Sequence, residues 1–104
     1  MIVVKYNRRE TTMTISGHAM TADKGKDLVC AAASVLGFTL IACVADSEEK
    51  FLPVLTQKDG ELRVACSPGR SFVTPCRRVM DTIFTGFEVL ANEHPDNVRA
   101  QRED

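Results

Sequence analysis

The chain has 104 residues, of which 44% are hydrophobic and 26% charged, and its formal net charge is −1. These values are ordinary for one soluble globular domain, which at this length folds without the help of a metal or a disulfide. Thirteen basic residues against fourteen acidic ones, with no basic stripe along the sequence, argue against direct nucleic-acid binding.

The first predicted elements are two strands. Residues 1–6 and 11–16 alternate apolar and polar side chains around the polar break Asn7-Arg8-Arg9-Glu10, which is typical of a β-hairpin. The amino terminus lacks the basic region, apolar core and small-residue cleavage site of a signal peptide. Gly17 ends the second strand, His18 follows it, and residues 19–26 form a polar connection.

The longest apolar stretch, residues 28–45, is predicted to be a helix because its apolar residues recur every three or four positions. Polar and small residues interrupt it, so a buried helix explains it better than a membrane span, and we expect a cytoplasmic protein. Asp27 is a favoured N-cap residue, because its carboxylate accepts an amide hydrogen two or three residues further on. This cap places Cys30 in the first turn.

A second hairpin is predicted from residues 51–57 and 61–67, joined by Lys58-Asp59-Gly60. An Asp-Gly pair between apolar alternations is a strong hairpin signal. Pro53 indicates that the first of these strands lies at an edge of the sheet or starts late.

The last third carries an apolar stripe at helical spacing over residues 73–90. Ser71 or Thr74 is expected to cap this helix, and Pro75 suits its first turn. The helix should end within residues 92–95, where His94 is interpreted as a C-terminal cap, and residues 97–101 form a short strand. The prediction is one domain over residues 1–104, an α+β two-layer fold with a mostly antiparallel sheet, two helices and the order ββαββα(β).

The four cysteines contain no C-x-x-C pair and no common zinc spacing, so neither a metal nor a cofactor is expected. Disulfides are unusual in a reducing compartment. Cys43 and Cys66 are therefore interpreted as small buried residues. Cys76 is expected to pack at the start of the last helix; the alternative is a mildly acidic thiol beside Pro75, Arg77 and Arg78.

Cys30 and His18 form the candidate catalytic pair. The thiolate is the reactive form of cysteine, and a position in the first turn of a helix favours that negative charge. A histidine at a strand end, twelve residues upstream across a loop, can take the thiol proton. Asp27 either caps the helix only or also orients the imidazole. Amides near Cys30 are the expected oxyanion donors. Ser34, one turn later, either supports the site or bonds back to a helix carbonyl.

These residues carry a family resemblance. Ser16-Gly17-His18-Ala19, followed by Gly25-Lys26-Asp27-Leu28-Val29-Cys30-Ala31-Ala32-Ala33-Ser34, resembles the paired motifs of the ribosomal-processing cysteine protease family, Prp. The resemblance implies a homodimer whose catalytic dyad is His18 and Cys30, with Asp27 and Ser34 at the two further motif positions. It also implies a cytoplasmic enzyme that removes the N-terminal extension of large-subunit ribosomal protein number twenty-seven during ribosome assembly. The substrate tail is expected to bind extended beside the loop at residues 19–26.

The chain departs from the family pattern after Ala19. Family members commonly continue with a glycine and an aromatic residue, where this chain has Met20 and Thr21. This difference bears on loop motion and on the substrate. Three alternatives therefore remain: a phage-associated protease that processes capsid or scaffold proteins, a non-catalytic protein-binding homologue, and a thiol hydrolase or acyl-transferase of small molecules.

Overall fold

The computed structural model describes residues 1–17, 24–58 and 60–104, with residues 24–27 as backbone only. The elements in chain order are β1 (Ile2–Asn7), β2 (Thr12–Ser16), α1 (Lys24–Asp46), α2 (Glu48–Phe51), β3 (Val54–Lys58), β4 (Glu61–Ala65), the short 3-10 helix η1 (Arg70–Phe72), α3 (Val73–Glu93) and β5 (Val98–Arg102). The predicted α+β order ββαββα(β) is confirmed, and α2 and η1 are additions to it.

The strands form one sheet in the order β3-β4-β2-β1-β5. Every neighbouring pair is antiparallel except β1 and β5, which run parallel. Alternation decides the two faces, because successive strand residues point to opposite sides. Val4, Tyr6, Met13 and Val64 are fully buried on one face, whereas Lys5 between the first two is exposed. One face of the sheet therefore carries the core.

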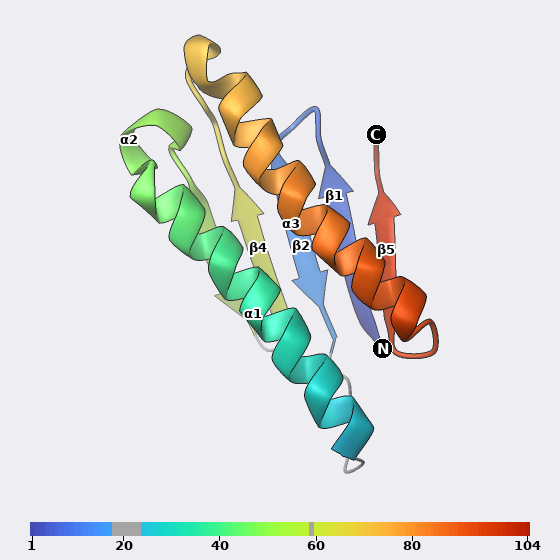
Figure 1. Ribbon diagram of the computed structural model, residues 1–104. Helices are drawn as coiled ribbons and strands as arrows, with labels where there is room; N and C mark the ends of the chain where they lie inside the picture. The colour runs from blue at the N-terminus through green and yellow to red at the C-terminus, as the bar shows by residue number, and fades with distance from the viewer. Residues whose placement is uncertain (18–23, 59) are drawn as a thin grey trace.

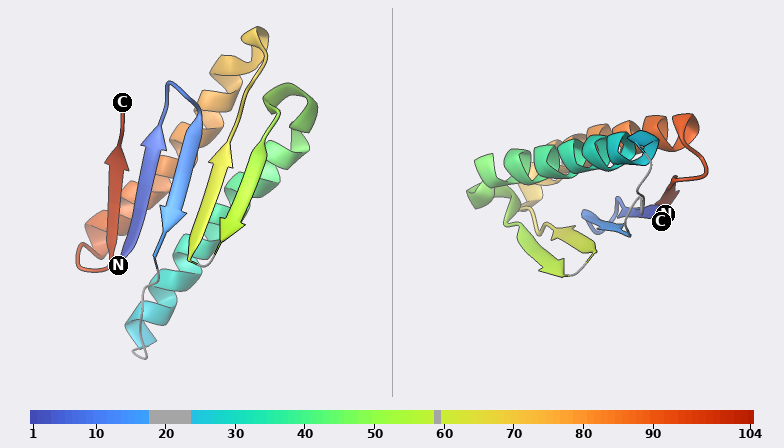
Figure 2. Two further views of the ribbon diagram at one scale, coloured as in Figure 1. Left: turned by 180° about the vertical axis from the view of Figure 1, so that it is seen from behind. Right: turned by 90° about the horizontal axis from the view of Figure 1, so that it is seen from below.

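The two long helices, α1 and α3, cover that face and form the second layer (Figures 1 and 2). The helix α3 buries the predicted stripe: Cys76, Met80, Ile83, Phe84 and Phe87. The two helices pack against each other. At their contact, a Cβ on Gly86 would lie 2.6 Å from Cδ2 of Leu36, so glycine permits this close approach.

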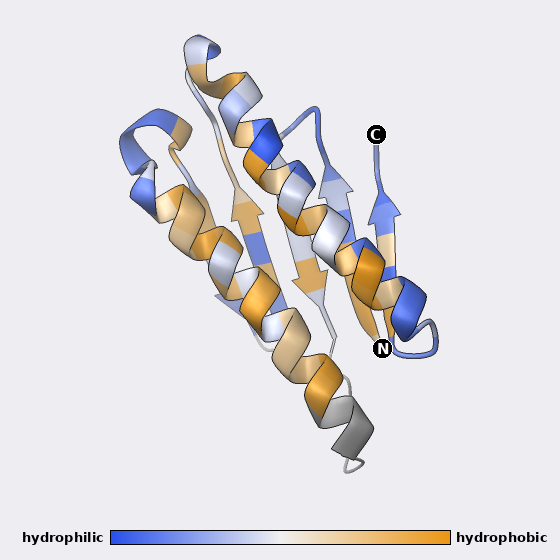
Figure 3. Cartoon of the chain, in the orientation of Figure 1, coloured by the Kyte–Doolittle hydropathy of each residue, from blue (hydrophilic) through white to orange (hydrophobic). Residues whose placement is uncertain are grey.

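The prediction of a buried helix for residues 28–45 is only partly right. The inner side of α1 is buried through Val29, Ala33, Leu40 and Val44. Its outer side is also apolar, as the hydropathy colouring in Figure 3 shows, but Leu28, Val35 and Phe38 on that side are exposed. Only 28% of the segment Leu28–Asp46 is buried, and by length and composition alone it is apolar enough to cross a membrane, with a mean hydropathy of 2.4.

The two helix starts differ from the predictions. The helix α1 already includes Lys24, so Asp27 is inside it and is not its N-cap. At α3 the N-cap is Phe72, which follows η1 and makes no side-chain capping bond, so neither Ser71 nor Thr74 is the cap. The helix α1 begins at Lys24, before the expected cap Asp27, and α3 continues directly from the 3-10 turn η1.

The second hairpin and the carboxyl-terminal elements agree with the sequence, except that Phe51, predicted to open the first strand of the hairpin, belongs to α2. The strand β3 begins at Val54, directly after Pro53, and lies at the edge of the sheet. Asp59 lies outside the described residues, and Gly60 has a φ of +70° that suits glycine. After α3, the His94 amide donates to the carbonyl of Leu90 at 2.9 Å, which confirms His94 as the C-terminal cap.

The prediction for the cysteines is right for two and wrong for one. Cys66 and Cys76 are buried, whereas Cys43 is exposed on the outer side of α1. The Cys66 and Cys76 thiols share a hydrogen bond. That hydrogen bond, together with burial, raises the pKa of Cys66. The same bond, more than the charge of Arg77, lowers the pKa of Cys76.

Candidate active site

Cys30 borders a cavity of about 250 Å³. The elements that line it meet at the end of the sheet where α1 begins (Figure 1). The cavity lies between the amino-terminal half of α1, the end of β2 and the β3–β4 hairpin. Its lining residues are Ile2, Ile15, Gly17, Cys30, Ala33, Ser34, Gly37, Phe38, Gln57, Lys58, Gly60, Glu61 and Leu62. This arrangement leaves the only cysteine of the cavity half-buried beside space that can hold part of a ligand.

Ser34 lies one helical turn after Cys30 and lines the same cavity. Its side chain is exposed, and within the described ranges its hydroxyl makes no hydrogen bond. By contrast, the Thr39 hydroxyl on the same helix bonds back to the carbonyl of Val35 at 2.6 Å. The Ser34 hydroxyl is thus available to a ligand in the cavity.

Gly17 fixes the position at which the chain leaves β2. Its φ is +91°, and a Cβ at this position would overlap the carbonyl oxygen of Met1, so only glycine fits. Its amide donates to the carbonyl of Gly60 at 2.8 Å, which holds it at the hairpin on the cavity wall. His18 is the next residue but lies outside the described residues.

The position of Cys30 in its helix differs from the prediction. Because α1 includes Lys24, Cys30 is in the second turn rather than the first. The helix-dipole effect is concentrated in the first turn, and an amide in the second turn is normally used by the carbonyl four residues earlier. The helix start therefore supplies neither the expected thiolate stabilisation nor oxyanion donors next to Cys30. The side chain of Asp27 is outside the described set, so its orienting role stays a prediction.

The sequence did not reveal the cavity walls. Ile15 and Leu62 are cross-strand partners on β2 and β4, and they close the sheet side of the cavity. A Cβ on Gly37 would lie 3.4 Å from Cδ1 of Ile15 and 3.6 Å from Cδ2 of Leu62. Strand alternation could have placed Ile15 and Leu62 on the core face, but the pairing of β2 with β4 was needed to bring them together.

Among the residues described, no cluster of three or more His, Cys, Asp or Glu side chains could hold a metal ion.

Comparison with known proteins gives matches to one family and to solved structures. The family model described as cysteine protease Prp matches residues 1–99. No curated protein matches the chain. The ribosomal processing protease Prp from S. aureus with a covalently linked product peptide is similar at 20% identity and a TM-score of 0.80, covering 99% of this chain and all of that one.

Two further solved structures share the fold. The S. aureus protease with a substrate peptide gives 18% identity and a TM-score of 0.75, covering 98% of this chain and 97% of that one. A Streptococcus mutans protein gives 19% identity and a TM-score of 0.71, covering 97% of this chain and 90% of that one. Since the family model spans nearly the whole sequence, this chain belongs to the Prp family of cysteine proteases.

Proposed function

We propose that this protease removes the N-terminal extension of large-subunit ribosomal protein number twenty-seven during ribosome assembly, with Cys30 as nucleophile and His18 as base. The observation that carries the proposal is that Gly17 and Cys30 line one cavity. His18 is joined to Gly17 by a peptide bond, so its Cα is about 3.8 Å from that of Gly17. This covalent link to a residue of the cavity wall supports His18 as the base for Cys30.

The proposed reaction is peptide hydrolysis through a thioester. The His18 imidazole takes the proton from the Cys30 thiol, and the thiolate attacks the scissile carbonyl carbon. The C–N bond then breaks as His18 returns the proton to the leaving amine. Water, deprotonated by the same imidazole, attacks the thioester and releases the second product and the free thiol.

Asp27 and Ser34 are proposed as supporting residues. Asp27 precedes Cys30 by three positions in α1, a spacing that suits a carboxylate orienting the imidazole. The exposed hydroxyl of Ser34, which has no hydrogen-bond partner among the described residues, is able to donate to the substrate or to the developing oxyanion. The expected effect of losing either residue is smaller than that of losing Cys30 or His18.

The substrate assignment draws on the cavity and on the S. aureus relative, which is a ribosomal processing protease solved with substrate and product peptides. Ile15, Leu62 and Phe38 give the cavity an apolar wall, whereas Lys58 and Glu61 place charges on it. Such a surface suits one apolar side chain of an extended peptide. The remainder of the tail is proposed to follow the loop at residues 19–26.

The test is incubation of the protein with a peptide that spans the extended terminus of the ribosomal protein, followed by mass spectrometry. We expect a single cut that yields the mature terminus. A phage capsid or scaffold peptide cut in preference would reassign the substrate. If no peptide is cut and iodoacetamide labels Cys30 no faster than the exposed Cys43, the site is not an activated thiol and the protein acts by binding.

We further propose that the enzyme is a cytoplasmic homodimer paired through the outer side of α1. Leu28, Val35 and Phe38 are 72%, 64% and 63% exposed on that side, and together they form a large apolar surface. The apolar stripe of α3, by contrast, is used by the core. Phe38 also lines the cavity, so pairing would place the partner chain next to the active site.

Replacing Val35 with glutamate should convert the dimer to a monomer in light scattering after gel filtration, because it buries a charge at the contact. Thr82→Glu, on the exposed side of α3, is the matched control and should leave the mass unchanged. A wild-type monomer, or a Val35→Glu dimer, would contradict this interface.

A further inference from the structure

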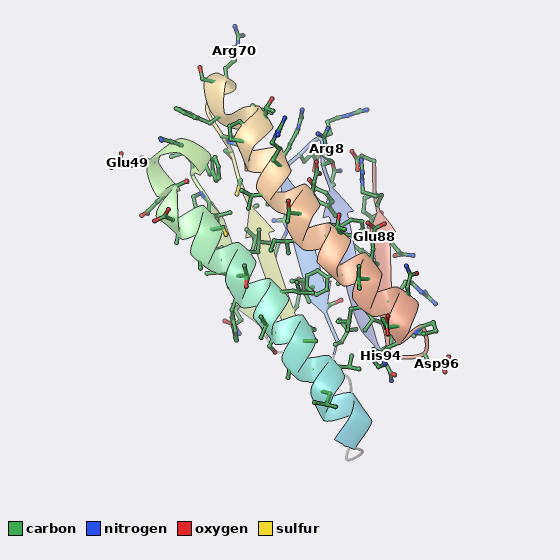
Figure 4. All side chains as sticks on the ribbon, viewed as in Figure 1. Arg8, Glu49, Arg70, Glu88, His94 and Asp96 are labelled. Atoms are coloured by element: carbon green, nitrogen blue, oxygen red, sulfur yellow. The ribbon has the colours of Figure 1, made fainter. Side chains whose placement is uncertain are left out.

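Six arginines gather at the end of the molecule away from the cavity. They come from the β1–β2 turn, η1, the beginning of α3 and the end of β5, and they are here called the arginine end: Arg8, Arg9, Arg70, Arg77, Arg78 and Arg102. Figure 4 shows Arg8 and Arg70 at this end, with His94 and Asp96 at the opposite one. Because four separate segments contribute, the sequence shows no basic stripe.

Arg77 holds two of these segments together. Its Nε donates to the carbonyl of Arg8 at 3.0 Å, and its Nη2 donates to the carbonyl of Arg9 at 3.1 Å. The β1–β2 turn is thus tied to the first turns of α3. Both acceptors are neutral, so no carboxylate offsets the charge of Arg77 through these bonds.

Most of the arginine charge at this end has no carboxylate partner. Arg8 pairs with Asp81 at 3.0 Å and Arg102 pairs with Asp104 at 3.0 Å. Across the described ranges, the other four arginines form no ion pair with a carboxylate. Arg9, Arg70 and Arg78 are exposed. Glu10, the acidic neighbour of Arg9, likewise forms no ion pair in those ranges. A chain with a net charge of −1 therefore carries a local positive surface.

We propose that the arginine end binds the phosphodiester backbone of RNA. The cluster is mainly arginine, with Lys50 beside it over the ring of Phe72 at 5.5 Å. The planar guanidinium fork matches phosphate oxygens better than an ammonium does. Guanidinium groups contributed by four segments suit a chain of repeated phosphates better than a single acidic side chain. The contact is sequence-independent, because the rings nearest to it, Tyr6 and Phe72, are buried or half-buried and offer no platform for bases.

The RNA contact and the cavity are at opposite ends of a molecule that is 45 Å long. An enzyme docked on RNA through the arginine end would keep its cavity open to a protein tail. This consequence rests on the proposed ribosomal substrate, whereas the RNA contact itself does not. Binding is therefore measured without any cleavage, so that a failure of one proposal is distinguishable from a failure of the other.

The experiment titrates the full chain into a short fluorescent single-stranded RNA and follows anisotropy as a function of salt. If the four arginines without a carboxylate partner each neutralise one phosphate, log Kobs falls against log[salt] with a slope of about −3. The RNA-binding constant then decreases about 50-fold between about 50 and 200 mM salt. The double variant Arg9→Gln, Arg78→Gln should halve the slope of log Kobs against log[salt] and weaken RNA binding by at least about tenfold at the lower salt. Arg63→Gln with Arg99→Gln, which removes the same charge from β4 and β5, should change binding less than about twofold.

Three results would overturn the proposal: no RNA binding at about 50 mM salt, equal losses in the two double variants, or displacement of RNA by polyglutamate at equal charge concentration. The last result would assign the surface to an acidic protein. Thermal melts of both variants verify that each is folded. Peptide cleavage by the Arg9 and Arg78 variant should match the wild type, because neither residue is near the cavity.

Discussion

The cavity end and the arginine end of this small protein are held by different forces. Around the cavity the walls are apolar, with Ile15, Leu62 and Gly37 in contact range and the Ser34 hydroxyl left open. At the other end, Tyr6, Arg8 and Asp81 form a network in which the Tyr6 hydroxyl donates to Asp81 at 2.7 Å. Both ends thus offer polar groups to a ligand, but at the arginine end these groups surround a hydrogen-bonded network, whereas at the cavity they lie beside an apolar wall.

The largest effect should come from Cys30→Ala. Removing the nucleophile is expected to lower kcat/KM for the ribosomal peptide by on the order of 10³ or more, because no other described group on the cavity can form the thioester. The unfolding temperature should change little, since Cys30 is only half-buried. Cys43→Ala is the matched control and should keep full activity. Full activity in the Cys30 variant would end the assignment of the cavity as the active site.

A second test reduces the cavity without touching Cys30. Gly37→Leu should place a side chain against Ile15 and Leu62 and lower kcat/KM by about 10- to 100-fold, mainly through KM, because an apolar subsite contributes about 1–3 kcal/mol. RNA binding at the far end should not change. An unaltered KM in a variant that melts normally would mean that the peptide binds elsewhere.

The hydrogen-bonded network at the arginine end is tested by Tyr6→Phe. This change removes the hydrogen bond from the buried Tyr6 to Asp81 and should cost about 1–2 kcal/mol in urea unfolding at constant m-value, while Arg8 continues to pair with Asp81. Cleavage per folded molecule should stay the same. A loss of activity without a loss of stability would show that the two ends are coupled.

The smallest expected effect depends on pH. Hydrogen bonds from Arg102 and from the amides of Arg8 and Arg9 hold the pKa of Asp104 below its ordinary value of 3.8. A depressed pKa contributes stability above the ordinary value, and that contribution is lost as the pH falls through the folded-state value. Asp104→Asn should therefore lower the melting temperature only slightly at pH 7, because the pair is solvent-screened, and the difference from wild type should shrink between about pH 4 and 2.

A difference that stays constant over that pH range would mean that the Asp104 carboxylate makes no charge-dependent contribution. Glu93→Gln is a suitable control, because Glu93 is exposed at the opposite end, and its melting temperature should follow the wild type at every pH.

The sequence by itself determined most of the fold. Alternation with period two identified the strands that pair as Val3 with Ser16 and as Lys58 with Glu61, and helical spacing identified the buried stripe of α3. These patterns are local consequences of backbone geometry, so they can be read without knowing what lies across the core. The paired motifs around His18 and Cys30 likewise indicated the family, which the match over residues 1–99 shows.

Only the tertiary structure decided where the helices start, which side of α1 stays uncovered, and which distant residues meet. Asp27 satisfies the local rule for a cap but lies within α1, and Cys43 fits a core pattern but is exposed. The cavity joins β2, α1 and a hairpin, and the arginine end joins four segments. Such sites depend on contacts between residues far apart in the sequence, and no local periodicity encodes those contacts.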